Sequence, residues 1–319
     1  MSMVFRDVAG PCLAPQGSVV CIGAFDGVHR GHRTVLERVC ERAQRLRALP
    51  VAVSFSPIPR AYFAELPQLT SPREKIRALI AGGMERVLLL RFNASMAAMA
   101  AEDFIAHVLV ERLAAREVWV GEGFQFGHGR KGDLALLQQV GIDDWFTAEA
   151  VPAFMVDGER VSSSRIRGLL VAGEFESAAT LLGRSFSIGG HVVRGQQLGR
   201  KLGYPTANIR LGSRVAPVGG VFAVRVHGVG DAIRPGVASL GVRPTVATAS
   251  AKEPVLEAHL FDFDGDLYGK RIQVEFVRKL RNEEKYPDLD AMVQQIDRDA
   301  IAARKILGVA ARTRTGVPA

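Results

Sequence analysis

Two histidines stand three positions apart in the stretch GAFDGVHRGH, residues 23–32. An apolar run precedes this stretch and a long amphipathic pattern follows it, so His29 and His32 are expected at a strand-to-helix turn. Glycines let a ligand approach such a turn, and the next helix offers unpaired N–H groups and a positive dipole end. Fixed donors there stabilise the charge that builds on phosphates during nucleotidyl transfer. A phosphate-binding turn is favoured over a metal site, because no third metal ligand is nearby. A short H-x-G-H motif also occurs by chance at ordinary helix starts, and this alternative stays open.

A second polar stretch, VSSSRIRGLL, spans residues 161–170. Serine hydroxyls followed by Arg165 suit a loop that holds phosphate oxygens by charge-assisted hydrogen bonds. The same residues would also form a plain helix start, with Ser163 or Ser164 as the N-cap and the arginine in solvent. The histidine turn at the other end of the same α/β region favours phosphate binding.

The stretch GRKLGYPTAN, residues 199–208, ends in oxygen-bearing side chains. The Thr206 hydroxyl and the Asn208 amide oxygen are hard ligands of the kind that Mg²⁺ accepts while it bridges nucleotide phosphates. Lys201 could meet a phosphate. A proline-anchored turn closed by asparagine is the competing interpretation, and the residues alone leave both open.

A carboxylate lies within the apolar run VLEAHLF, residues 255–261. Strand alternation places Glu257 and His259 on one face of the strand and Leu256, Ala258 and Leu260 on the other. On this pattern alone Glu257 simply faces water, and His259 is interpreted as structural.

The elements that position these residues change in kind near Gly183. Before it, β-branched runs alternate with helical periods, which predicts a Rossmann-like parallel sheet wrapped by helices. After it, strands separated by glycine and proline turns predict a small antiparallel β-barrel, and a helical pattern over Leu289–Leu307 closes the chain. The elements expected in the first part are SVVCIG, Thr34–Arg47, VAVSF, Arg73–Ala81, RVLLL, Glu102–Ala114 and EVWVG, and the strands expected in the second are FSIGGHVV, GVFAVRV, GVASLG, VLEAHLF and RIQVEFV.

The composition limits the class of protein. With 319 residues, 48% of them hydrophobic and 23% charged, the chain is long enough for two globular domains. It has no apolar run of the ~20 residues that a membrane span needs and no signal-peptide pattern, so we expect a cytoplasmic protein without a membrane partner. Cys12, Cys21 and Cys40 lack metal-ligand spacing and are expected to be reduced thiols. The net charge of +8 favours an anionic ligand, a nucleotide or a nucleic acid, and the oligomeric state stays open.

The sequence resembles the prokaryotic bifunctional riboflavin kinase/FMN adenylyltransferase (FAD synthetase) family, which is related to the class I aminoacyl-tRNA synthetases. The resemblance covers roughly residues 17–308 and rests on IGAFDGVHRGH and further motifs in the family's order. These motifs are LTSPREKIRAL, RVLLLRF, AAEDFI, GFQFGHGRKGD, VSSSRIRGLL, GRKLGYPTANI, GVASLGVRPTV, LEAHLFDFDGDLYGK and VRKLRNEEKY. The resemblance implies an adenylyltransferase domain over residues 1–182, a riboflavin kinase domain over 183–309 and a tail over 310–319.

The resemblance also implies the chemistry. ATP would phosphorylate riboflavin to FMN in the second domain, and a second ATP would adenylylate FMN to FAD, with release of pyrophosphate, in the first; Mg²⁺ would serve both steps. The catalytic residues would be His29, His32, Arg165 and Glu257, with Glu257 as the general base that takes the proton of the riboflavin 5′-hydroxyl. The nucleotide-binding residues would be Gly23, Phe25, Asp26, Gly31, Ser162, Ser163, Ser164, Gly199, Lys201, Thr206 and Asn208, of which Thr206 and Asn208 would also hold the metal. The stretch RNEEKY would lie where the family packs the isoalloxazine ring, with no individual residue assigned.

The sequence departs from the family most at Gly123, where members carry Asp or Asn whose side chain belongs to the adenylyltransferase site. Ser56 and Ile58 also depart, since Glu and often a polar residue stand there. One alternative is therefore a riboflavin kinase with a weakened adenylyltransferase. Another alternative is an RNA-binding synthetase-like protein. The sequence has no basic stripe interleaved with aromatic residues, so we expect no nucleic acid partner. Salt-sensitive binding of tRNA would distinguish this alternative from the enzyme of flavin synthesis.

Overall fold

The computed structural model of the chain describes residues 3–195, 199, 202–212, 215–242 and 254–310. The chain divides into two compact units, residues 1–163 and residues 164–319. Among the described residues, no helix combines the length and the apolar character that crossing a membrane requires. Cys12, Cys21 and Cys40 are all free thiols.

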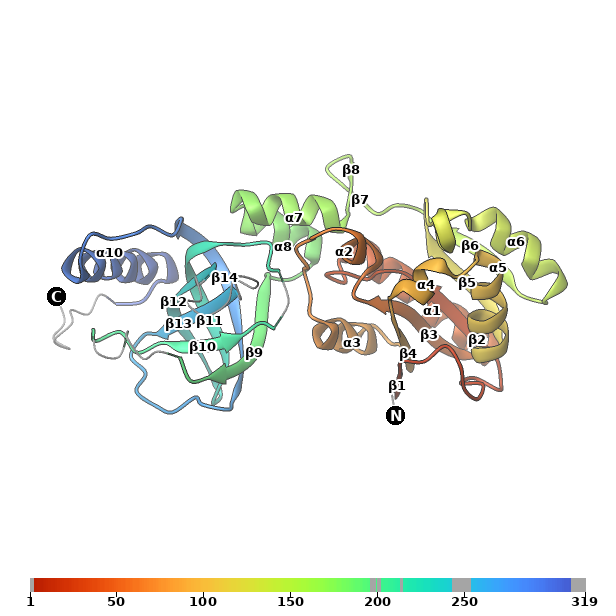
Figure 1. Cartoon of the computed structure of the whole chain (residues 1–319), viewed down its shortest axis with the longest axis horizontal. Helices are drawn as coiled ribbons and strands as arrows, with labels where there is room; N and C mark the ends of the chain where they lie inside the picture. The colour runs from red at the N-terminus through yellow and green to blue at the C-terminus, as the bar shows by residue number, and fades with distance from the viewer. Residues whose placement is uncertain (1–2, 196–198, 200–201, 213–214, 243–253, 311–319) are drawn as a thin grey trace. The chain divides into compact units, whose positions relative to one another are not determined.

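The first unit is built on a six-stranded parallel sheet in the order β1-β4-β3-β2-β5-β6 (Figure 1). The strands are β1 (Met3–Phe5), β2 (Ser18–Ile22), β3 (Leu49–Ser56), β4 (Arg86–Arg91), β5 (Ala115–Gly121) and β6 (Thr147–Val151). From β2 the chain moves through β3 and β4 to one side and then crosses to β5 and β6 on the other. The order therefore reverses between β2 and β5, and open α/β sheets bind ligands beyond the carboxyl ends of the strands at such a point.

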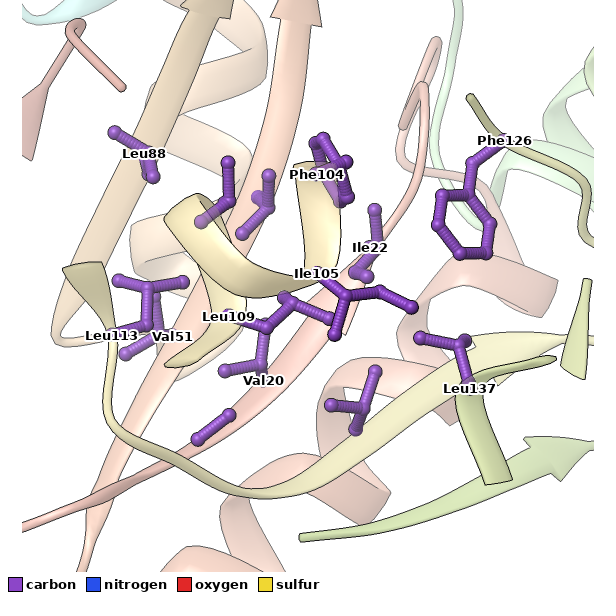
Figure 2. Close-up of a cluster of buried hydrophobic side chains, with 14 of the residues drawn as sticks. Val20, Ile22, Val51, Leu88, Phe104, Ile105, Leu109, Leu113, Phe126 and Leu137 are labelled. Atoms are coloured by element: carbon purple, nitrogen blue, oxygen red, sulfur yellow. The ribbon is translucent and has the colours of Figure 1, made fainter. Parts of the chain in front are cut away.

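Helices cover both faces of this sheet. They are α1 (Arg30–Leu46), α2 (Pro59–Phe63), α3 (Pro72–Ala81), α4 (Ala94–Ala98), α5 (Ala101–Phe104), the π-helix η1 (Ile105–Arg112), the 3₁₀-helix η2 (His128–Arg130) and α6 (Leu134–Asp143), followed by the short hairpin β7 (Met155–Val156) and β8 (Glu159–Arg160). On one face, Ile105 and Leu109 of η1 pack with Val20 of β2, as Figure 2 shows. On the other face, Val35 of α1 and Leu79 of α3 pack in a second cluster of buried side chains.

The second unit combines two helices, a closed barrel and a terminal helix (Figure 1). Its elements are α7 (Ser163–Ala172), which starts at the last residue of the first unit, α8 (Phe175–Leu182), β9 (Ser187–Val193), β10 (Ala207–Arg210), β11 (Gly220–Val229), β12 (Ala232–Val242), β13 (Pro254–Leu260), β14 (Arg271–Arg281) and α10 (Leu289–Leu307). The barrel order is β10-β13-β12-β11-β14-β9, and every pair is antiparallel. Ala303 of α10 packs on Ala223 and Phe261.

The fold class expected from the sequence is confirmed: an α/β unit with a parallel sheet is followed by an antiparallel barrel and a closing helix. The helix over Leu289–Leu307 has the predicted bounds, whereas the helix expected from Thr34 begins at Arg30. The single helix expected over Glu102–Ala114 is instead a short α-helix that continues as a π-helix. The motif GRKLGYPTAN, interpreted on its own as a possible turn, ends in the strand β10.

Candidate active sites

The turn between β2 and α1 carries the two histidines and lies where the strand order reverses. Phe25 and Val28 take left-handed backbone conformations, with φ angles of 46° and 40°. Such conformations are costly for bulky side chains and are found mainly at functional sites. A Cβ at Gly23 would lie 3.1 Å from the Phe25 ring, and one at Gly31 would lie 3.4 Å from the His29 ring. The turn is therefore tightly folded around its aromatic side chains.

The rings of His29 and His32 stack, with 3.6 Å between their centroids. His29 is the N-cap of α1, and its Nδ1 accepts the His32 N–H over 3.3 Å, so the proton of a neutral His29 ring sits on Nε2. Burial first, and then the charges of His29 and Lys75, hold the pKa of His32 well below its usual value. His32 Nδ1 is buried and has no hydrogen-bond partner in the described part of the chain. A polar group of a ligand would satisfy that nitrogen.

Asp26 joins the turn to the segment before α3. Its carboxylate is buried and accepts the N–H groups of Leu69 and Thr70, each over 3.0 Å, as well as the Thr70 hydroxyl over 3.2 Å. The Thr70 hydroxyl in turn accepts the Gly27 N–H over 3.1 Å. Sequence reasoning placed Asp26 among the nucleotide-binding residues, and in the structure its carboxylate holds the backbone of the turn.

The serine stretch crosses the division between the units. Ser162 and Ser163 belong to the first unit, and Ser164 and Arg165 open the second. The Ser163 hydroxyl donates to the main-chain carbonyl oxygen of Asp26 over 2.9 Å. The first helical residue of α7 is thus tied to the histidine turn. The triphosphate contact expected of this serine stays a prediction.

Lys75 lies in the motif LTSPREKIRAL, but the sequence analysis assigned it no role in this site. It lies in the first turn of α3 and is 2% exposed. Its Nζ donates to the Phe55 carbonyl oxygen over 2.8 Å and to the Ser54 hydroxyl over 3.3 Å. Lys75 also stands four positions before Leu79, so the helical spacing places it on the buried face of α3.

In the second unit, three oxygen-bearing side chains lie just before β10, on β10 and on β13. The Thr206 hydroxyl donates to the Glu257 carboxylate over 3.4 Å. Asn208 directly opposes Glu257 in the antiparallel pair, so their side chains leave the sheet on the same face. Leu256 and Ala258 are fully buried and Glu257 is half-buried, so the alternation predicted for this strand holds.

This donor set fits Mg²⁺, which prefers hard oxygen ligands. Among the described residues, no cluster of three or more His, Cys, Asp or Glu side chains could hold a metal by itself. An ion beside Thr206 and Asn208 would therefore complete its shell with nucleotide phosphates and water, as Mg²⁺ does in complexes with ATP.

The segment before β10 is shaped by close backbone packing. The Gly199 carbonyl accepts the N–H groups of Leu202 and Tyr204 over 3.1 and 2.8 Å. A Cβ at Gly195 would lie 2.5 Å from the side-chain amide of Asn208. Lys201, expected to meet a phosphate, lies outside the described residues.

Helix α10 braces the same segment. The Tyr204 hydroxyl hydrogen-bonds to the Asp297 carboxylate, and the Tyr204 ring meets His259 edge-on at 5.1 Å. His259 Nδ1 donates to the Pro205 carbonyl oxygen over 2.9 Å, and burial lowers the pKa of His259. These contacts agree with the structural interpretation of His259, which stays a prediction, and they add Tyr204 and Asp297 as supports that sequence reasoning missed.

Glu283, in the stretch RNEEKY, is a second carboxylate near this site. A Cβ at Gly241 would overlap the Glu283 carboxylate, so only glycine leaves room for it on β12. Burial raises the pKa of Glu283, the charge of Glu257 raises it further, and Arg281 opposes the shift. The region expected to hold the flavin ring thus contains a carboxylate, that of Glu283, which interacts electrostatically with Glu257.

Gly123, the main departure from the family pattern, lies in the exposed loop after β5. Its φ is 73°, and a Cβ built on it would meet nothing within 4 Å. The neighbouring Glu122 carboxylate accepts the Ala153 N–H over 3.2 Å. The loop therefore has room for a side chain at position 123 but holds its backbone in a left-handed conformation.

Comparison with protein families gives two matches that together span most of the chain. Residues 13–165 match the model of the FAD synthetase family, and residues 182–307 match that of the riboflavin kinase family. The first match contains the histidine turn and the serine stretch through Arg165, and the second contains Thr206, Asn208 and Glu257.

Similar proteins match over nearly their full lengths. The bifunctional riboflavin kinase/FMN adenylyltransferase of Escherichia coli K12 is 44% identical over 311 residues, which cover 96% of this chain and 98% of that protein. Those of Pseudomonas fluorescens and Haemophilus influenzae are 43% and 40% identical, and each match covers 91% of this chain and 93% or 94% of the relative. A crystal structure described as a macrolide-efflux protein from Streptococcus pneumoniae matches with a TM-score of 0.77 at 27% identity, over 95% of this chain and 98% of that one.

Proposed function

The chain belongs to the family of bifunctional riboflavin kinase/FMN adenylyltransferases, and we propose that its two reactions use two separate sites. One is the turn after β2, with the serine stretch, and the other is the group of oxygen donors Thr206, Asn208 and Glu257 at β10 and β13. The protein phosphorylates riboflavin with ATP to give FMN and ADP, and it transfers AMP from a second ATP to FMN to give FAD and pyrophosphate. The proposal assigns these two reactions to residues.

At the adenylyltransferase site, the phosphate chain of ATP binds at the N-terminus of α1, where unpaired N–H groups and the helix dipole favour an anion. A phosphate oxygen of FMN attacks the α-phosphorus, and the bond from that phosphorus to the pyrophosphate oxygen breaks. His29, through Nε2–H, and His32 donate to the oxygens on which charge builds, which is a preorganised stabilisation of the transition state. Ser162, Ser163, Ser164 and Arg165 hold the triphosphate, with Gly23, Phe25 and Gly31 shaping the turn and Asp26 fixing its backbone.

At the kinase site, Glu257 accepts the proton of the riboflavin 5′-hydroxyl, whose oxygen then attacks the γ-phosphorus of ATP, and ADP leaves. Thr206 and Asn208 would hold Mg²⁺, which would neutralise part of the charge of the phosphates when bound. Gly199 and Lys201 belong to the nucleotide-binding side of this site. The 3.4 Å contact between Thr206 and Glu257 supports the proposal, because the proposed base and a proposed metal ligand are then neighbours.

One observation carries the assignment: the stacked histidines and the Thr206–Glu257 pair lie in different units of the chain. Substitutions in one site should therefore spare the other reaction. The test uses the full chain with riboflavin, ATP and Mg²⁺, and separates riboflavin, FMN and FAD by chromatography. His32→Ala should lower adenylylation of FMN by ~10²-fold or more, the loss expected for one preorganised donor, and leave riboflavin phosphorylation intact.

Glu257→Gln should do the reverse, with riboflavin phosphorylation lost and adenylylation of added FMN retained. His107→Ala is the matched control for the first variant, because His107 is an exposed histidine of the same unit. Equal loss of both activities in folded His32→Ala protein, or unchanged phosphorylation in Glu257→Gln, would contradict the assignment.

Gly123 favours a second candidate, a working kinase joined to a weak adenylyltransferase. It offers the reacting nucleotide no side chain, and the same chromatographic assay would then show FMN accumulating. We also propose that the protein acts in the cytoplasm.

A further inference from the structure

Lys75 places an ammonium group in the interior of the first unit. The side chain is 2% exposed, and its Nζ donates to the Phe55 carbonyl oxygen and the Ser54 hydroxyl. An ammonium has three N–H donors, so one is left without a partner among the described residues.

The surroundings of Lys75 destabilise a positive charge. Burial penalises the charged form, and the first turn of a helix presents the positive end of its dipole. Lys75 forms no ion pair within the described part of the chain. Burial lowers the pKa of Lys75 to about 8, and only the charge of Asp26 opposes this shift. The Asp26 oxygens are themselves bonded to Leu69 and Thr70.

This ammonium lies next to the turn that carries the histidines. The Ser54 hydroxyl, which accepts from Lys75, donates to the Ala24 carbonyl oxygen of that turn over 3.2 Å. The charge of Lys75 also helps to lower the pKa of His32. The titratable groups around it are therefore Asp26 in the turn and the stacked pair His29 and His32 at the start of α1.

We infer that Lys75 is a positioning residue of the adenylyltransferase reaction, whose buried ammonium supplies the positive charge against which the phosphate chain of ATP binds on the turn 23–32. A buried cation without an anionic partner attracts an anion more strongly than an exposed one, because little water screens it. The phosphates would add a negative charge to that of Asp26, which forms no ion pair with Lys75. This inference rests on the proposed location of the adenylyltransferase site.

A purely structural role makes a different prediction. A neutral amine still donates hydrogen bonds to Phe55 and Ser54, so deprotonation would leave such a role intact. An electrostatic role disappears with the charge. The pH dependence of ATP use therefore separates the two, because phosphate groups titrate near pH 6, well below Lys75.

The experiment measures kcat/KM for ATP in the adenylylation of FMN by the full chain between pH 6.5 and 9.5. In the wild type the value should fall as pH rises through about 8, where the ammonium loses its proton. In Lys75→Arg that fall should vanish, because a guanidinium stays charged over the whole range. In Lys75→Met the value should be about 10- to 100-fold lower and independent of pH near 8.

Three controls accompany this experiment. Riboflavin phosphorylation in the same samples reports on the other unit and should not change. Arg45→Met removes an exposed positive charge from the last turn of α1 and should leave both activities unchanged. Thermal melting of each variant reports folding, and Lys75→Arg decides the question if Lys75→Met does not fold.

A wild-type profile without a fall near pH 8, or Lys75→Met within twofold of the wild type, would overturn the inference. A fall that persists in Lys75→Arg would overturn it as well, because another group would then be titrating. Failure of the proposed site itself is recognised separately, since His32→Ala would then adenylylate FMN at the wild-type rate whatever Lys75 does.

Discussion

The Ser163 hydroxyl donates a hydrogen bond to the main-chain carbonyl oxygen of Asp26, 2.9 Å away, although the two residues are 137 positions apart. One belongs to the serine stretch at the end of the first unit, and the other to the histidine turn near its beginning. The bond fixes the backbone of the turn from one side, while Leu69 and Thr70 hold the Asp26 carboxylate from another. If a nucleotide binds to these stretches as proposed, this bond would link its contacts with one stretch to the position of the other.

Replacement of this hydroxyl should therefore slow adenylylation. Ser163→Ala removes one hydrogen bond, which is worth about 0.5–1.5 kcal/mol, so kcat/KM for FMN adenylylation should fall by roughly 2- to 10-fold. Riboflavin phosphorylation should not change. Ser177→Ala, on the exposed side of α8, is the control for loss of a serine hydroxyl. An unchanged rate in Ser163→Ala would mean that the bond has no part in the reaction.

Gly195 gives a way to move a proposed metal ligand without replacing it. A Cβ at this position would lie 2.5 Å from the Asn208 side chain, so Gly195→Ala should push the amide away from Thr206 and Glu257. Riboflavin phosphorylation should then need a several-fold higher Mg²⁺ concentration, with the donor set itself intact. A magnesium titration of the kinase rate measures this.

Gly219→Ala is the matched control, because a Cβ there makes only an ordinary contact of 3.7 Å with the Leu240 carbonyl oxygen of the same barrel. The same magnesium dependence in Gly195→Ala and the wild type would contradict the role of Asn208 as a ligand.

The elements that could be predicted from the sequence are those with strong local patterns. The helical pattern over Leu289–Leu307 predicts both bounds of α10, and the structure adds Gly308 as its C-cap. The start of α1 was placed four residues late, because its N-cap is a histidine and its first turn holds Arg30 and Gly31 instead of residues typical of a helix start. β10 was missed because its pairing partners, β9 and β13, are distant in sequence.

For the candidate sites, too, local patterns were recognised in the sequence and contacts between distant segments were not. The turn with His29 was found from residue types and spacing, and strand alternation placed Glu257 on the correct face. No role was predicted for Lys75, Tyr204 or Asp297, since each contacts an element that is distant in sequence. Sequence patterns reveal groups that share one short segment, whereas groups that support them from another element appear only when the fold is known.

The start of the kinase domain can be tested with fragments. Phe175 of α8 is buried, and its ring lies 5.8 Å from Phe222 and 6.2 Å from Phe276 in the barrel. Fragments 164–319 and 183–319 should both phosphorylate riboflavin, because both contain the proposed kinase residues. The shorter one loses the buried Phe175, worth about 1.5–3 kcal/mol, and its melting temperature should be roughly 5–10 °C lower.

Phe175→Ala in the longer fragment should reproduce much of this difference, and Val171→Ala, at an exposed position of α7, should not. Melting curves and riboflavin phosphorylation of all four proteins measure the effect. Equal melting temperatures of the two fragments would place α8 outside the folded domain, and a shorter fragment that folds without phosphorylating riboflavin would contradict the boundary at residue 183.

The effect of Gly123 on the adenylyltransferase can be tested by substitution. If the missing side chain simply impairs the site, Gly123→Asn should raise the rate of FAD formation from FMN without altering riboflavin phosphorylation. Asparagine is the suitable replacement, because it tolerates the φ of 73° and a Cβ there meets nothing within 4 Å. Gly123→Val tests the backbone alone, since a β-branched residue is strained at this φ and should slow adenylylation.

The other account is that Glu122 compensates, with its carboxylate taking the place of the missing side chain. In the structure this carboxylate accepts the Ala153 N–H, so compensation requires it to exchange that bond for the nucleotide. Glu122→Gln should then lower the wild-type rate, and Gly123→Asn should add little. Compensation is the expected result, because the remaining adenylyltransferase motifs are all present, and an inactive site would not be expected to retain them. Pyrophosphate release from FMN and ATP by the wild type and these variants measures the outcome, and undetectable release by the wild type would exclude compensation.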